Sequence, residues 1–261
     1  MKLDQVFALA KSEKRAALIG YMPAGFPSKE GSKRLIAAMI EGGVDIVEVG
    51  YPYSDPVMDG PVIQQAAEIA LRNNTSAADV FDVVKASLVP TLVMSYWNPI
   101  ERYGVDRFAK ELANVSGVGV ITPDLTVEES QPWIDATESH GINRVYVVAP
   151  SSNDQRLSMV TAACSGFVYA ASLMGVTGAR TTLSSAASEL VARLRRVTHL
   201  PVAVGLGVSN PTQASEVARY ADGVIVGSAF IKLVLDSLSI DEAIPKVKEL
   251  AEQLAKGVRR T

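Results

Sequence analysis

The acidic residue best placed to do chemistry is Glu48, inside the short apolar segment 45–50. Side chains alternate between the two faces of a β-strand, so Glu48 shares one face with Ile46 while Val47 and Val49 share the other. If the valines pack against helices, Glu48 points into the interior of the sheet. A buried carboxylate is destabilising unless it is partnered or protonated. Glu48 is therefore either part of a buried ion-pair network or a general acid/base with a raised pKa.

The loop that follows, residues 51–61, adds Asp55 and Asp59. It is long for a strand-to-helix connection and rich in turn-forming residues. Asp55 precedes a proline and Asp59 precedes a glycine, so either aspartate alone could simply stabilise a turn. Together with Glu48, one of them becomes a second carboxyl group above the same cavity. Two carboxyl groups in unlike surroundings can divide acid and base roles, each contributing roughly 10²–10⁴ in rate.

Glycine-rich turns follow three consecutive predicted strands near the end of the chain. They read Gly175-Val176-Thr177-Gly178, Gly205-Leu206-Gly207 and Gly227-Ser228-Ala229. Glycines let backbone N–H groups approach an anion, and a short helix that begins near Ser228 adds the positive end of its dipole. One such turn is weak evidence, because turns after strands often need glycine. Three at consecutive strand ends predict a phosphorylated ligand.

Other catalytic groups are scarce. The two histidines, His140 and His199, fall just before predicted strands, at the end opposite the acids, and no His/Cys/acid cluster offers a zinc site. No lysine stands at the carboxyl end of a predicted strand, and Lys232 lies a turn into the helix after Ser228, which disfavours Schiff-base chemistry. The remaining chemistry is carboxylate acid/base catalysis on a phosphate-bearing substrate, without a metal.

Short apolar segments alternate with longer amphipathic ones along the whole chain, and they must position these groups. The predicted strands are 17–21, 45–50, 91–95, 118–121, 144–148, 167–171, 202–205 and 223–226. The predicted helices are 3–12, 31–41, 63–72, 77–87, 106–114, 127–139, 154–163, 186–197, 212–220 and 240–256. This unbroken alternation favours an α/β fold of the closed (β/α)8 type, a TIM barrel, over an open sheet. Residues 1–261 are predicted to form a single domain, in which residues 1–16 are an N-terminal capping helix over the bottom of the barrel.

Length and composition agree with this fold. The chain has 261 residues, close to the roughly 250 that are typical of such barrels. Its net charge of -3 disfavours nucleic-acid and membrane partners. The single cysteine, Cys164, excludes an intramolecular disulfide and suits a reducing compartment. We therefore expect a cytoplasmic protein.

Five stretches of the chain resemble one enzyme family, the α subunits of tryptophan synthase. The most specific is VEVGYPYSDPVMDGP at 47–61, which looks like the signature of that family. The others match in order and spacing: 94–99, Pro123-Asp124 with 127–130, 175–178 and 223–229. The resemblance covers nearly the whole chain and implies the same barrel fold.

The resemblance implies a lyase of tryptophan and aromatic amino-acid biosynthesis. Its reaction would be a retro-aldol cleavage of indole-3-glycerol phosphate to indole and glyceraldehyde 3-phosphate. Glu48 would protonate indole C3 and take the proton of the side-chain hydroxyl, while Asp59 would accept the indole N–H. Tyr169 would orient Glu48 or the substrate, and Thr177 would close over Asp59. The phosphate site would comprise Gly178, Gly207, Gly227 and Ser228. The indole pocket would comprise Tyr21, Met94, Ile121 and Ile225, although ordinary core packing explains these four equally well.

The resemblance also implies a partner, a β subunit that uses pyridoxal phosphate and receives indole directly. The expected complex is an α2β2 heterotetramer, with the loop 51–61 and the segment around Asn98 facing the partner. The α chain itself would need no cofactor and no metal.

Some positions depart from the commonest family pattern. Leu173 and Met174 replace a frequent Arg-Ala pair, and Leu206 replaces a frequent Phe. Tyr53 and Met58 replace Phe and Ala. These changes bear on loop closure, on the shape of the indole pocket and on the fit to the partner, but not on the proposed acids.

Three other functions stay open at this point. Another phosphate-binding barrel enzyme, such as an isomerase of histidine or tryptophan biosynthesis, would place its acids, or a Cys and an Asp, on different strands. A freestanding indole-3-glycerol-phosphate lyase would turn over without a partner. A barrel that serves only as an allosteric or scaffold subunit would bind ligand without turnover.

Overall fold

The computed structural model describes residues 2–171, 180–205 and 207–260. Over these residues eight parallel strands close into a barrel, each hydrogen-bonded to the next and β8 to β1. The strands are β1 (Ala17–Pro23), β2 (Ile46–Gly50), β3 (Thr91–Met94), β4 (Gly119–Thr122), β5 (Asn143–Val148), β6 (Val168–Ala171), β7 (Val202–Gly205) and β8 (Gly223–Val226). The fold is the predicted (β/α)8 barrel.

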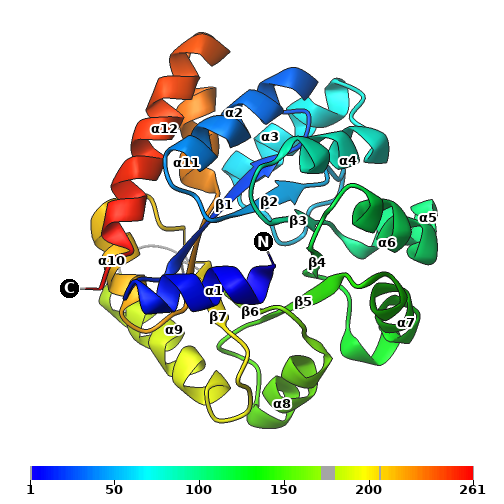
Figure 1. The fold of residues 1–261 in the computed structure, drawn as a ribbon, viewed down its shortest axis with the longest axis vertical. Helices are drawn as coiled ribbons and strands as arrows, with labels where there is room; N and C mark the ends of the chain where they lie inside the picture. The colour runs from blue at the N-terminus through cyan, green and yellow to red at the C-terminus, as the bar shows by residue number, and fades with distance from the viewer. Residues whose placement is uncertain (1, 172–179, 206, 261) are drawn as a thin grey trace.

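Helices surround this barrel on all sides (Figure 1). They are α1 (Leu3–Ser12), α2 (Lys29–Glu41), α3 (Pro61–Arg72), α4 (Ala77–Ala86), α5 (Trp97–Tyr103), α6 (Val105–Asn114), α7 (Gln131–His140), α8 (Asp154–Ala163), α9 (Arg180–Leu194), α10 (Pro211–Ala218), α11 (Ser228–Leu235) and α12 (Ile240–Gly257). Several begin at a residue whose side chain accepts a hydrogen bond from the first turn. Asn210 Oδ1 accepts from Gln213 N at 3.0 Å at the start of α10, and Ser239 Oγ accepts from Glu242 N at 3.2 Å at the start of α12. These caps satisfy N–H groups that have no partner within the helix.

The helical layer differs from the prediction at several points. Helix α9 begins at Arg180 and ends at Leu194, whereas 186–197 was predicted. The segment 127–139 is not one helix, because a 3-10 turn, η1 (Val127–Glu129), precedes α7. Pro132 explains the break, since its ring would clash with the carbonyl four residues earlier in a continuous helix. Helix α5 was not predicted. It follows β3 almost directly and holds Pro99 in its first turn, where proline is tolerated.

The strands separate two hydrophobic cores. Ile46 on β2 belongs to the inner core inside the barrel, whereas Val47 and Val49 belong to the outer core against the helices. This alternation is the period of two expected for a strand. It turns Glu48, like Ile46, toward the inside of the barrel.

The N-terminal helix closes one end of the barrel, the end from which the strands start. Leu3, Val6, Phe7 and Ala10 of α1 join the inner core, and the Phe7 ring lies 5.7 Å from the ring of Phe167 between centroids. Figure 1 shows α1 lying across the barrel. The helix ends at Ser12, so it is shorter than the predicted segment 1–16. The opposite end of the barrel is where the strands finish.

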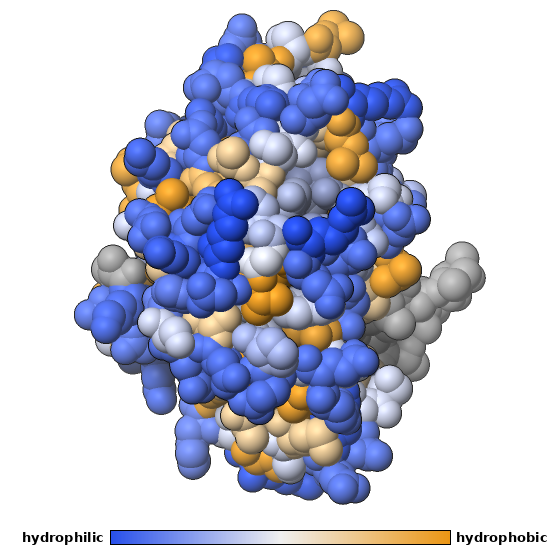
Figure 2. All heavy atoms as spheres, turned by 90° about the vertical axis from the view of Figure 1, so that its right-hand side faces the viewer, coloured by the Kyte–Doolittle hydropathy of each residue, from blue (hydrophilic) through white to orange (hydrophobic). Residues whose placement is uncertain are grey.

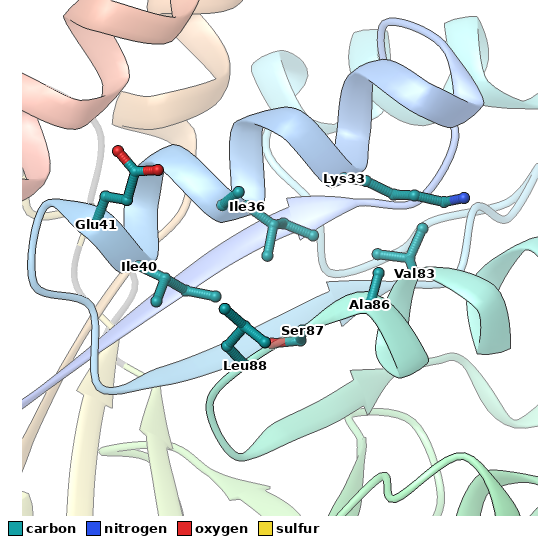
Figure 3. A pocket seen from close by; sticks show the side chains of 9 residues that line it. Lys33, Ile36, Ile40, Glu41, Val83, Ala86, Ser87 and Leu88 are labelled. Carbon is teal, nitrogen blue, oxygen red and sulfur yellow. The ribbon is translucent and has the colours of Figure 1, made fainter.

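The outer surface is largely hydrophilic. The face in Figure 2, which is the right-hand side of Figure 1 around α5 to α7, shows only scattered apolar patches. No helix in the described part of the chain is long and apolar enough to cross a membrane. A small hollow of about 100 Å³ lies between α2 and α4 (Figure 3), lined by Lys33, Ile36, Ala37, Ile40, Glu41, Val83, Ala86, Ser87 and Leu88. It lies in the helical layer and shares no residue with the cavity inside the barrel.

Removing the α1 side chain that enters the inner core should destabilise the barrel. We expect Phe7→Ala to lower the free energy of unfolding by about 3–5 kcal/mol, because it leaves a cavity under a fully packed core. Urea denaturation followed by circular dichroism measures this change. Leu9→Ala on the same helix is the control: Leu9 is 43% exposed, so its loss should change stability by less than about 0.5 kcal/mol. Equal effects of the two variants would contradict the role assigned to α1.

Candidate active site

A cavity of about 450 Å³ opens at the carboxyl ends of the strands. This is the end of a (β/α)8 barrel at which active sites lie. Six strands and the loop after β2 contribute to its wall. The lining residues are Tyr21, Glu48, Met58, Asp59, Gly60, Pro61, Val62, Ile63, Met94, Tyr169, Ala171, Gly205, Gly207, Ile225, Gly227 and Ser228. The cavity therefore brings together residues that are far apart in the sequence.

Glu48 is the buried acid of this cavity. Its side chain comes from the middle of β2, and the residue is 1% exposed. Neither carboxyl oxygen has a hydrogen-bond partner among the described residues. Burial alone raises the pKa of Glu48 from 4.5 to about 8, because a charged carboxylate loses its hydration in this position. The group is thus protonated near neutral pH and can both donate and regain a proton.

Asp59 is the second acid of the cavity. Burial raises its pKa from 3.8 to about 6, and a hydrogen bond with Tyr96 opposes that rise. The Tyr96 hydroxyl also accepts a 2.8 Å hydrogen bond from the backbone N–H of Met58, so one tyrosine holds this part of the loop. The Gln64 amide donates a 2.8 Å hydrogen bond to the backbone carbonyl of Asp59. The first turn of α3 therefore fixes the main chain at the aspartate.

The structure distinguishes the two aspartates of the loop after β2. Asp55 is exposed and accepts a 2.5 Å hydrogen bond from Ser54, an arrangement that stabilises the loop locally. Only Asp59 lines the cavity with Glu48. With a pKa of about 6 for Asp59 and about 8 for Glu48, the cavity holds one ionised and one protonated carboxyl group at pH 7. That pairing suits simultaneous base and acid roles.

Two tyrosines line the cavity beside the acids. Burial raises the pKa of both Tyr21 and Tyr169, and the carboxyl groups of Glu48 and Asp59 raise each further. Both hydroxyls are therefore neutral hydrogen-bond donors at neutral pH. Tyr169 lies close to the end of β7, where a Cβ atom on Gly205 would be 2.5 Å from its hydroxyl oxygen. The absence of a side chain at position 205 makes room for this tyrosine.

The opposite part of the cavity is suited to an anion. Gly207 has a positive φ of 66°, and Gly227 is the residue before α11, which begins at Ser228. No side chain in the described part of the chain caps this helix. With respect to these residues its first N–H groups are available to a ligand, and the positive end of its dipole lies at the cavity. Of the other residues predicted to hold phosphate or close the site, Gly178 and Thr177 lie outside the described residues, as do Leu173, Met174 and Leu206.

Of the four residues predicted to form the indole pocket, three line the cavity and one does not. Tyr21, Met94 and Ile225 line the cavity. Ile121 pairs with Met94 in the sheet but is fully buried in the inner core and is not part of the lining. The sequence analysis missed Val62 and Ile63, which enter the cavity from the first turn of α3. Their position directly after Asp59-Gly60 could have indicated them, because the start of a helix after a catalytic loop faces the same way as the loop.

Fold and cavity together define a class: a (β/α)8-barrel enzyme whose cavity at the carboxyl ends of the strands holds two carboxyl groups and the N-terminus of a helix. In the described ranges, no group of three or more His, Cys, Asp and Glu side chains could hold a metal ion. The profile of the family described as tryptophan synthase alpha chain matches residues 7–259. The chain belongs to this family. It is therefore an indole-3-glycerol-phosphate lyase of tryptophan biosynthesis.

Individual members of the family are similar to this chain over nearly its full length. The tryptophan synthase alpha chain of Streptomyces avermitilis is 58% identical, over 98% of this chain and 94% of its own length. That of Thermobifida fusca is 56% identical, over 98% and 97%. A chain in a solved structure of Mycobacterium tuberculosis tryptophan synthase superposes with a TM-score of 0.92 at 48% identity, covering 99% of this chain and 98% of that one.

Because burial raises the pKa of Glu48, stability should depend on pH through this residue. The folded protein holds the Glu48 proton more tightly than the unfolded chain does, so the free energy of unfolding falls as pH rises from about 4.5 to about 8. Glu48→Gln removes this dependence. We expect the variant to gain stability relative to wild type across that window, reaching at most roughly 5 kcal/mol above pH 8.

Urea denaturation at pH 4.5, 6.5 and 8.5 tests this difference. The exposed Glu101 on α5 supplies a matched control, and Glu101→Gln should leave the pH dependence of unfolding as in wild type. A constant difference between Glu48→Gln and wild type at all three pH values would show that Glu48 is not held as an uncharged acid.

Proposed function

We propose that this lyase cleaves indole-3-glycerol phosphate by a retro-aldol reaction in which Glu48 is the general acid/base. The observation that carries the proposal is the placement of Glu48 in a cavity at the carboxyl ends of the strands. Its buried carboxyl group has no hydrogen-bond partner within the described ranges and a pKa of about 8. The products are indole and glyceraldehyde 3-phosphate.

During the reaction Glu48 first donates a proton to the substrate and then accepts one from it. Its protonated form gives a proton to indole C3, which converts the ring to an electrophilic cation. The carboxylate that remains takes the proton from the hydroxyl on the adjacent side-chain carbon. The carbon–carbon bond then breaks as this carbon becomes an aldehyde, and its electrons restore the aromatic ring. The proton balance closes, since Glu48 ends the cycle protonated, as it began.

Asp59 stabilises the positive charge that develops on the ring. As the carboxyl group with the lower pKa of the pair, it is ionised when Glu48 is still protonated. It accepts a hydrogen bond from the indole N–H, and this interaction strengthens as protonation of C3 makes the N–H more acidic. Tyr169 orients Glu48 or the substrate from β6, and Thr177 closes over Asp59.

The phosphate end of the substrate lies at α11. Ser228 and the free N–H groups of the first helical turn bind the phosphate oxygens, and Gly207 and Gly227 allow the close approach of the main chain. Gly178 completes this site. Tyr21, Met94 and Ile225 contact the indole ring, and Ile121 supports them from the core. This orientation puts the reacting bond between the phosphate site and the two acids.

We further propose that the chain works with a β subunit in an α2β2 complex. The near full-length match to a chain in tryptophan synthase of Mycobacterium tuberculosis supports this partner. So does the loop after β2, whose apolar residues Val57 and Met58 are 79% and 47% exposed beside the cavity mouth. The loop and the segment around Asn98 face the partner, which holds pyridoxal phosphate and receives the indole. This chain binds no cofactor of its own and works in the cytoplasm.

Replacing either acid should abolish or impair turnover while the fold is retained. We expect Glu48→Gln to lower kcat by roughly 10²–10⁴ and Asp59→Asn by roughly 10². Release of glyceraldehyde 3-phosphate from indole-3-glycerol phosphate measures both, with and without the β subunit. Asp55→Asn in the same loop is the control, and in the isolated chain it should retain activity.

The outcomes of this assay separate the alternatives. Wild-type cleavage that rises when the β subunit is added supports the complex, whereas equal turnover without the partner indicates a freestanding lyase. Ligand binding without turnover under either condition would leave a scaffold subunit. Full activity in Glu48→Gln would move the acid/base to another residue.

Loss of the Ser228 hydroxyl should weaken substrate binding rather than chemistry. We expect Ser228→Ala to raise KM roughly tenfold with kcat nearly unchanged, because one hydrogen bond to a charged group is lost in ground state and transition state alike. Ser237→Ala, beyond the other end of α11, is the control and should not change KM. A Ser228→Ala variant with wild-type KM would place the phosphate elsewhere in the cavity.

A further inference from the structure

Tyr21 fills space that two glycines leave open. A Cβ atom on Gly50 would lie 2.3 Å from the Tyr21 hydroxyl oxygen, and one on Gly227 would lie 3.1 Å from its ring carbon Cδ1. Gly50 ends β2 and Gly227 follows β8, and these strands flank β1, which carries Tyr21. A side chain at position 50 would displace the tyrosine hydroxyl. The glycine at position 50 therefore determines where this hydroxyl lies.

The Tyr21 hydroxyl lies on the same side of the barrel wall as Glu48. Glu48 and Gly50 are two residues apart on one strand, so both positions face inward and are roughly 6.6 Å apart. Tyr21 is also the register partner of Glu48 across the β1–β2 pair. The Tyr21 hydroxyl, which lies next to Gly50, is thus two residues further along the strand direction than Glu48. Tyr21 and Glu48 line the same cavity.

Glu48 needs a hydrogen-bond donor at one stage of the reaction. Its two carboxyl oxygens have no partner in the part of the chain that is described, which suits the protonated acid but not the carboxylate. A buried carboxylate is stabilised chiefly by the hydrogen bonds it accepts. Tyr21 is 8% exposed, and burial together with the carboxyl groups of Asp59 and Glu48 raises the pKa of its hydroxyl. That hydroxyl keeps its proton and is a donor.

We propose that Tyr21 is a positioning residue for Glu48: its hydroxyl donates a hydrogen bond to the carboxylate that forms when Glu48 gives its proton to the substrate. The ring of Tyr21 shields that carboxylate from bulk water. This inference rests on the proposed function, because it requires Glu48 to transfer a proton. It gives the tyrosine a role beyond that of an indole-pocket wall, which a phenylalanine would fill equally well.

The test compares Tyr21→Phe with wild type in the presence of the β subunit over a range of pH. The protonated form of Glu48 starts the reaction, so activity falls at high pH as this group ionises. Removing the donor destabilises the carboxylate, so the alkaline limb of kcat/KM should move up by about one pH unit and kcat should fall about tenfold. KM should change little, since the aromatic ring remains. Tyr146→Phe is the control: Tyr146 is 2% exposed in the outer core, and the variant should keep the wild-type profile.

Gly50→Ala provides a second variant, because it keeps the tyrosine but displaces its hydroxyl. It should shift the alkaline limb in the same direction, and it carries the test if Tyr21→Phe does not fold. An unmoved limb in both variants, or a raised KM with wild-type kcat, would overturn the inference and leave Tyr21 as a wall of the substrate site. Glu48→Gln is assayed in parallel. Full activity in that variant would refute the proposed function itself, whereas its inactivity beside an unmoved limb would refute only the role of Tyr21.

Discussion

The structure depends on one unfavourable placement, a carboxyl group inside the barrel that has no hydrogen-bond partner among the described residues. Glu48 is on the same face of β2 as Ile46, so the alternation that packs the inner core also buries the acid. An ionised carboxylate would be expensive there, and the group responds by holding its proton. The pKa of about 8 is thus a consequence of the strand register. Burial by itself therefore makes Glu48 a usable acid near neutral pH.

A closed barrel can tolerate such a group because its two ends differ. At the end where the strands begin, α1 inserts Phe7 and its neighbours into the inner core and completes the apolar packing. At the other end β2 and β7 finish in Gly50 and Gly205, Gly227 follows β8, and a cavity lies there rather than a core. Tyrosines occupy part of the space next to Gly50, Gly205 and Gly227. These glycines therefore shape the floor of the cavity as well as the turns after the strands. The packed inner core under α1 and the cavity therefore lie at opposite ends of the same barrel.

The loop after β2 adds a second carboxyl group, that of Asp59, to the cavity that holds Glu48. Tyr96 and the start of α3 hold Asp59 at the cavity, and Asp59 is less completely buried than Glu48. Its lesser burial and its hydrogen bond with Tyr96 keep the pKa of Asp59 below that of Glu48. The same loop exposes Val57 and Met58 beside the cavity mouth. One segment thus lines the cavity and, in the proposed complex, contacts the partner.

The sequence alone determined the number and order of strands and the family, because strand periodicity and a specific motif are local features of the chain. It left the face of Glu48 conditional, and the structure decided it by packing Val47 and Val49 in the outer core and Ile46 in the inner one. The residue types alone left Asp55 and Asp59 open, because both stand in similar turn contexts, and the family resemblance favoured Asp59. The tertiary structure shows that, of the two, Asp59 lines the cavity while Asp55 is exposed. It also separated Ile121 from the cavity lining and brought Val62 and Ile63 into it. The break before α7 was readable from Pro132 in principle, whereas α5 has little amphipathic pattern and is specified mainly by its neighbours. Burial and proximity, which set the pKa of Glu48 and place Tyr21 beside it, arise only when distant strands close into a barrel.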